Sequence, residues 1–253
     1  MRRSEIDITK GLALILMIIY HIFFMIDFFN INNFEMSSGI LGMISSLSHN
    51  TFILMAGVNL YLSYKKNKDE FYKKQNKRVT KVASGALFMN IFSYFAFGKE
   101  LYIKFGILHF MTVAIIISYF IVKSKILSLV ISILFYILSL YVKNNGYMFD
   151  SCKNYSFLCS ILGIYNKHNM NFQSLDHFAI IHTYGLFAFG IFLGYLLYEN
   201  KKSKKNKKKN KNQIINEIEK LGQNTFNIYI LHWPILYIIF YIYSLILTKK
   251  IEN

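Results

Sequence analysis

The chain has 253 residues, a formal net charge of +16, 54% apolar residues and a single proline. Its mean hydropathy is +0.34, and several apolar runs reach the ~20 residues that a bilayer-spanning helix needs. This composition excludes a separate soluble domain. The basic run 201–211 has no interleaved aromatic residues, which argues against a nucleic-acid partner.

The first expected span, residues 6–29, opens with Asp7 and Lys10 and holds His21 deep among apolar residues. An ionisable group inside a membrane helix is costly, and it therefore indicates a functional site. Eleven residues of helix bring Lys10 and His21 to nearly the same face, about 16 Å apart. Asp7 lies within roughly 40° of His21 on that face. A polar stripe is therefore predicted to run inward from the membrane surface and to end at an imidazole.

Six further apolar spans follow, and together they predict an all-α polytopic transmembrane bundle of about seven helices. In chain order they are expected at about 39–64, 79–97, 105–122, 126–142, 176–198 and 224–247. Lysine-rich connections at 65–77 and 199–221 mark the cytoplasmic side, where anionic lipid also attracts them. The N-terminus is then cytoplasmic, and residues 144–175 form an extracytoplasmic segment whose apolar part is too short to cross the bilayer.

With this topology, most of the histidines are expected at a similar depth in the membrane. Four of the seven are expected near the external face: His21, His49, His109 and His182. The rim just above them carries three more polar residues, which are Asp27, Asp176 and His177. An outward-opening polar cavity explains such a layer. His232 is expected nearer the midplane, where it fills the bundle beside Pro234 and bonds a carbonyl freed by the proline kink.

Other sites receive little support from the sequence. Cys152 and Cys159 both fall in the external segment, so a disulfide remains open, although seven residues of helix would separate the two Cα atoms by about 10 Å. The histidines lack the paired spacing of a metal site, and no metal is predicted. Gly190 and Gly194 have the small-x-x-x-small spacing of a helix-packing face.

Five sequence blocks, in order along nearly the whole chain, carry a resemblance to a known family. They are Ile6-Asp7-x-x-Lys10-Gly11-x-Ala13 with Met17-x-x-x-His21; Phe52-Ile-Leu-Met-Ala-Gly57 with Tyr61 and Ser63; Phe105-Gly106-Ile-Leu-His109; Leu175-Asp176-His177-Phe178 ahead of Gly185 and Gly190; and Leu221-Gly222 through Tyr229 to His232-Trp233-Pro234. The chain resembles the integral-membrane family related to heparan-α-glucosaminide N-acetyltransferase, within the wider transmembrane acyltransferase group.

That resemblance implies a single transmembrane acyltransferase-like domain over residues 1–253. It implies transfer of an acyl group, usually acetyl from cytoplasmic acetyl-CoA, to an extracytoplasmic acceptor such as a glycan hydroxyl or amine. The expected location is the plasma (cytoplasmic) membrane, with the lipid bilayer and the acceptor as partners and a homo-oligomer left open.

The resemblance also suggests roles for individual residues. His21 would act as a general base or carry an acetyl group, assisted by His109 and Asp176. Donor phosphates would meet a second set of residues: Asp7, Lys10, Arg78 and Lys81. Acceptor binding would involve a third set: Asp27, His177 and His182.

Two other classes of function fit the polar layer. A proton-coupled small-molecule transporter could relay protons through it, although the two halves of the chain show no repeat. A non-catalytic membrane partner subunit would keep the fold, and its function would survive loss of His21.

Overall fold

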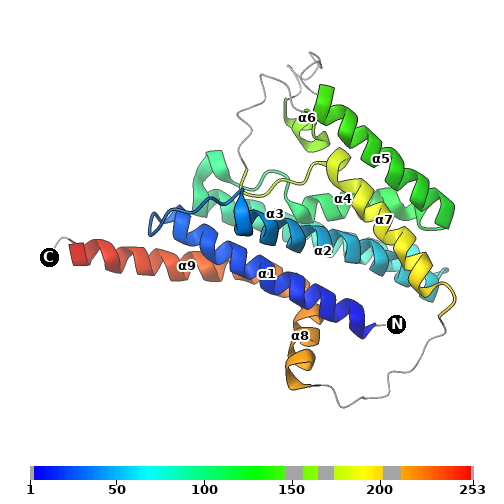
Figure 1. The fold of residues 1–253 in the computed structure, drawn as a ribbon, viewed down its shortest axis with the longest axis horizontal. Helices are drawn as coiled ribbons and strands as arrows, with labels where there is room; N and C mark the ends of the chain where they lie inside the picture. The colour runs from blue at the N-terminus through cyan, green and yellow to red at the C-terminus, as the bar shows by residue number, and fades with distance from the viewer. Residues whose placement is uncertain (1–2, 146–155, 165–173, 202–211, 252–253) are drawn as a thin grey trace. The chain divides into compact units, whose positions relative to one another are not determined.

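The computed structural model describes residues 3–145, 156–164, 174–201 and 212–251, and in these ranges the chain is all-α (Figure 1). The helices are α1 (Ser4–Phe28), α2 (Gly39–Lys66), α3 (Phe71–Leu101), α4 (Ile107–Ile121), α5 (Lys125–Asn145), α6 (Ser156–Leu162), α7 (Ile180–Tyr198), α8 (Gln213–Gln223) and α9 (Thr225–Ile251). An isolated backbone pairing between Phe105 and His177 accompanies them. The all-α prediction is confirmed.

Five of these helices are long and apolar enough to cross a membrane: α1, α2, α5, α7 and the Thr225–Leu247 part of α9. The shorter apolar helix α4 was also predicted as a span. The predicted span 79–97 lies inside α3, whose first turns carry several cations and lower its hydropathy. The expected seven spans therefore correspond to these seven helices.

The connections are more helical than expected. Within 65–77, α2 continues to Lys66 and α3 begins at Phe71, so residues 67–70 alone separate the two helices. The end of the basic connection 199–221 forms α8, which begins after Asn212, whose side chain accepts a hydrogen bond from the Ile214 N–H. Cys152 lies outside the described residues, and so does much of the segment 144–175 that was predicted to be extracytoplasmic.

The chain divides into two compact units. The first, called here the α3–α7 unit, comprises the described residues from Ile53 to Lys201, and it includes the second half of α2. The other, the α1–α9 unit, comprises Arg2–Phe52 and Ser203–Asn253.

Small residues set the packing of the α3–α7 unit. Gly57 of α2 and Gly190 of α7 approach so closely that a Cβ on Gly190 would overlap the Leu54 carbonyl. A Cβ on Gly194 would lie 2.8 Å from the Tyr61 side chain. The predicted packing role of the Gly190 and Gly194 spacing is confirmed, because missing side chains let helix backbones come together. On the other side of α7, Ser132 of α5 donates to the Gly185 carbonyl at 2.9 Å.

Glycines also set the packing of the α1–α9 unit, where α8 lies against the first half of α1 (Figure 1). A Cβ on Gly11 would overlap the carbonyl of Ile218, and one on Gly222 would overlap the carbonyl of Asp7. The first half of α2 joins this unit through Ser48, which donates to the Ala13 carbonyl at 2.8 Å. The start of α1 is thereby held on two sides.

Candidate active site

The α1–α9 unit brings two histidines and a tryptophan together. The rings of His21 on α1 and His232 on α9 have centroids 4.9 Å apart. Trp233 packs against His21 with centroids 4.5 Å apart, and it is 2% exposed. His232 is 6% exposed, so an imidazole pair stands in apolar surroundings.

The hydrogen bonds of this pair fix where its basic nitrogens lie. His21 Nδ1 lies 2.8 Å from the Met17 carbonyl, and His232 Nδ1 lies 2.6 Å from the Tyr229 carbonyl. Since a carbonyl accepts only, both Nδ1 atoms donate, and in the neutral rings both Nε2 atoms carry the lone pair. Among the described residues, the buried Nε2 of His232 has no hydrogen-bond partner. An unpaired basic nitrogen in an apolar site is costly, so it indicates a group kept for chemistry.

His232 is buried and bonds a backbone carbonyl, as predicted for a residue that fills the bundle. Its contact with His21 corrects the separate depth that was predicted for it. The reason is the glycine contact at the start of the unit. His21 follows Gly11 by ten residues, and His232 follows Gly222 by ten residues. Gly222 lies near the end of α8 and α9 begins just after it at Thr225; since α1 and α9 then run in the same direction (Figure 1), both imidazoles reach one level and meet. The equal spacing was the signal that could have identified His232.

Three other residues predicted for the site make contacts within α1 or in the turn that follows it. Lys10 and Asp7 form an ion pair, with Nζ 2.7 Å from Oδ1 and side chains 17% and 7% exposed. The charge of Lys10 is therefore largely compensated within the helix. At the opposite end, Asp27 accepts a hydrogen bond from the Phe34 N–H at 2.9 Å and fixes the turn after α1.

His109 and Asp176 are brought together in the α3–α7 unit, at the start of α4. The Gly106 N–H donates to His109 Nδ1 at 3.2 Å, and His109 Nε2 lies 2.9 Å from the side-chain amide of Asn90. Asp176 Oδ2 accepts from the Ile107 N–H at 3.1 Å. Both side chains satisfy amides that a helix start leaves unpaired. This geometry gives them a structural role, and a catalytic role for either stays a prediction.

His177 and His182 connect α6 to the start of α7. His177 Nε2 donates to the Ser160 carbonyl at 3.0 Å, and His182 Nε2 donates to the Gly163 carbonyl at 2.9 Å. His182 Nδ1 then accepts from the Ser139 hydroxyl at 2.8 Å. Gly163 has a φ of +94° and lies so close to His182 that a side chain would not fit there. Acceptor binding by these histidines stays a prediction.

The remaining predicted residues lie on α3. Arg78 is half-buried, and Lys81 is exposed. Neither an ion pair nor a hydrogen bond joins Arg78 to another part of the described chain. Over the same residues, no group of three or more His, Cys, Asp and Glu side chains is arranged to hold a metal ion.

Comparison with known proteins agrees with the sequence blocks. The family profile described as heparan-alpha-glucosaminide N-acetyltransferase, catalytic, matches residues 2–234. No curated protein and no solved structure matches the chain. The match extends from the start of α1 to Pro234 and so includes both members of the imidazole pair. The chain belongs to the heparan-α-glucosaminide N-acetyltransferase catalytic family of integral membrane proteins.

Proposed function

We propose that this protein transfers an acyl group, in the first instance acetyl, from cytoplasmic acyl-CoA to an extracytoplasmic hydroxyl or amine such as that of a glycan. The plasma membrane is the proposed location. Membership of a membrane acetyltransferase family supports the reaction class. The observation that carries the proposal is the contact of half-buried His21 with buried His232, whose Nε2 has no partner among the described residues.

The pair supplies the proton transfers that acyl transfer needs. His232 Nε2 takes the proton of the acceptor O–H or N–H as the acceptor attacks the thioester carbonyl. The new C–O or C–N bond forms, the C–S bond breaks, and the thiolate of CoA takes the proton back. His21, in ring contact with His232, stabilises the imidazolium and orients the acceptor. Trp233 keeps water from the thioester, which would otherwise hydrolyse.

The activity test uses the full chain in lipid nanodiscs with radiolabelled acetyl-CoA and a panel of sugar and amine acceptors. Wild type is expected to bind acetyl-CoA saturably and to release or transfer the label. His232→Ala and His21→Ala are each expected to lose at least about 100-fold in turnover, the usual contribution of general acid–base groups. His49→Ala removes a histidine of α2 outside the pair and is expected to keep wild-type turnover.

Two results would change the proposal. Retained turnover in His232→Ala would remove the pair from the mechanism. Absence of binding for every short acyl-CoA would overturn the reaction class and favour the proton-coupled transporter.

A covalent intermediate is tested separately by incubating wild type with labelled acetyl-CoA and no acceptor. Direct transfer predicts no label on the denatured protein. Label on His21 or His232 would establish an acetyl-histidine intermediate instead.

A further inference from the structure

The helix α8 has an apolar face that the described part of the chain covers only in part. Four apolar side chains share this face through their i, i+1, i+4, i+7 spacing: Ile214, Ile215, Ile218 and Leu221. Toward the end of α8, this side of the helix packs on α1 at Asp7 and Gly11. At the beginning of α8, Ile214 is 67% exposed and Ile215 is 39% exposed. Two adjacent isoleucines therefore extend beyond the contact with α1.

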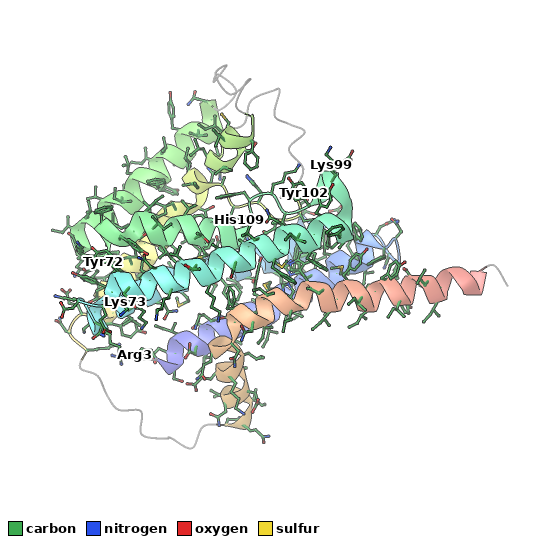
Figure 2. All side chains as sticks on the ribbon, turned by 180° about the vertical axis from the view of Figure 1, so that it is seen from behind. Arg3, Tyr72, Lys73, Lys99, Tyr102 and His109 are labelled. Carbon is green, nitrogen blue, oxygen red and sulfur yellow. The ribbon has the colours of Figure 1, made fainter. Side chains whose placement is uncertain are left out.

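The orientation of α8 places these isoleucines along the membrane surface. α8 lies across α1 and not along it (Figure 1), and Figure 2 shows it from behind, extending away from the end of α1 where Arg3 is labelled. Both α1 and α9 are candidate membrane spans, and Asn224 alone separates α8 from α9. A helix that crosses one span near its start and leads directly into another lies at the level where both spans enter the bilayer. Since basic residues predict that this end is cytoplasmic, the surface belongs to the cytoplasmic leaflet.

The length and the two faces of α8 suit a helix that lies in the membrane interface. Its 11 residues are about 16 Å long, which is too short to cross a bilayer. The face opposite the isoleucines is polar, and its exposed members are Gln213, Asn216, Glu217 and Lys220. A helix of this kind is stabilised when its apolar face is buried at the boundary between headgroups and acyl chains and its polar face stays in water.

The segment that precedes α8 carries charge of the sign that an anionic surface attracts. Residues 201–211 contain eight lysines and no acidic residue. Each basic residue near an anionic leaflet strengthens binding to it by a factor of about five. This run leads directly into Asn212, whose side chain accepts a hydrogen bond from the Ile214 N–H and fixes the first turn of α8. The cationic run therefore joins α8 at the end where the isoleucines are exposed.

We propose that Ile214 and Ile215 insert into the cytoplasmic leaflet and that anionic lipid holds α8 on this surface. The partner is a negatively charged bilayer surface, and the contact is separate from the chemistry of acyl transfer. Because α8 also contacts Asp7 and Gly11, a firmer hold on α8 fixes the start of α1. The charge of the lipid thereby controls the stability of this end of the α1–α9 unit.

The depth of α8 is measured with nitroxide labels on the full chain, in nanodiscs of equal parts phosphatidylcholine and phosphatidylglycerol. Ile214→Cys is labelled in a background with both native cysteines replaced, and Asn216→Cys on the polar face is the matched control. The label at Ile214→Cys is expected to collide more often with oxygen, which concentrates in lipid. The label at Asn216→Cys is expected to collide more often with a water-soluble nickel chelate. Equal collision with the nickel chelate at both positions overturns the insertion.

Amide hydrogen exchange in the unmodified chain provides a measurement that does not depend on how a variant folds. Exchange in α8 is compared between nanodiscs of phosphatidylcholine alone and nanodiscs with equal parts phosphatidylglycerol. Anionic lipid is expected to slow this exchange at least about fivefold, the effect of one lysine at the surface. Salt at about 1 M, where charges are screened beyond about 3 Å, should remove the difference. Exchange in α7 is the internal control and should be the same in both lipids; exchange in α8 that ignores lipid charge overturns the proposal.

The double variant Ile214→Gln/Ile215→Gln tests whether the isoleucines themselves are needed. It keeps all the lysines and replaces each isoleucine with a good helix former, so most of the slowing by anionic lipid should be lost through loss of insertion alone. Gln213→Ala/Asn216→Ala makes the same number of changes on the polar face and should keep the slowing. A double isoleucine variant that retains the wild-type response overturns the insertion. None of these measurements uses turnover, so their failure leaves the proposed function standing, and a protein without acyl transfer leaves them unaffected.

Discussion

At the scale of single residues, the Asp7–Lys10 pair shows that a lysine predicted to bind a ligand can instead form an ion pair within its own helix. The ion pair is mostly buried, and Asp7 Oδ2 has no hydrogen-bond partner among the described residues. Removing one member of a buried ion pair leaves the other charge buried without a partner, which lowers the free energy of unfolding by about 3–5 kcal/mol. We therefore expect Asp7→Asn and Lys10→Met each to lower the melting temperature in nanodiscs.

The double variant Asp7→Asn/Lys10→Met is expected to recover much of that loss, because no uncompensated charge remains. The same cycle tests the prediction that these residues bind the acyl donor. A rise in the KM for acetyl-CoA in Lys10→Met that persists in the double variant would assign Lys10 to donor binding. Recovery of KM together with stability would assign the pair to structure.

In the α3–α7 unit, a variant of His182 can likewise distinguish a structural role from a binding role. Both of its ring nitrogens are engaged, one with Ser139 on α5 and one with the Gly163 carbonyl at the end of α6. His182→Ala is therefore expected to increase hydrogen exchange in the α6 amides while kcat and KM for the acceptor change less than about threefold. A large increase in acceptor KM with unchanged exchange would support the predicted acceptor-binding role.

At the scale of elements, the contact between α1 and α8 is the one on which the alignment of the imidazole pair depends. A Cβ on Gly222 would overlap the Asp7 carbonyl, which is backbone and cannot rotate away. We expect Gly222→Ala to destabilise the protein by about 1–3 kcal/mol, the usual cost of overpacking. Because the contact sets the level of His232 against His21, turnover should also fall in the fraction that stays folded.

Leu12→Ala is the control for that prediction, because Leu12 lies beside Gly11 in the sequence and is 48% exposed. It should leave both the melting temperature and turnover near wild type. Wild-type turnover and stability in Gly222→Ala would show that α8 can shift without moving the pair.

The elements also show what the sequence could and could not predict. Apolar runs predicted α1, α2, α5, α7 and α9, because a lipid environment demands long apolar helices. The amphipathic α8 was missed, since it follows a run of lysines in a connection expected to be irregular. His21 could be identified from its own helix. His232 required a contact between helices more than 200 residues apart in the chain, and periodicity within one helix does not contain that information.

At the scale of the whole molecule, the proposed reaction is directional. Basic residues predict that the N-terminus is cytoplasmic, and acyl-CoA is a charged molecule that does not cross lipid. A transferase of this design should therefore consume acyl-CoA on one side of the bilayer and deliver product on the other. Purified protein in sealed proteoliposomes tests this, with acceptor trapped inside and labelled acetyl-CoA added outside.

In such vesicles the orientation of the chain has to be known, and single-cysteine variants provide it. In a background with both native cysteines replaced, Ser203→Cys reports the predicted cytoplasmic connection and Asn33→Cys the predicted external turn. A membrane-impermeant thiol reagent should label Ser203→Cys in those molecules that take their acyl-CoA from outside. Labelled product should then accumulate inside the vesicles, in proportion to the fraction of molecules that the reagent labels at Ser203→Cys. No product should accumulate when the vesicles contain His232→Ala in place of the wild type. If product forms only when acceptor and acyl-CoA are in the same compartment, the protein is still an acyltransferase, but transfer across the membrane is contradicted.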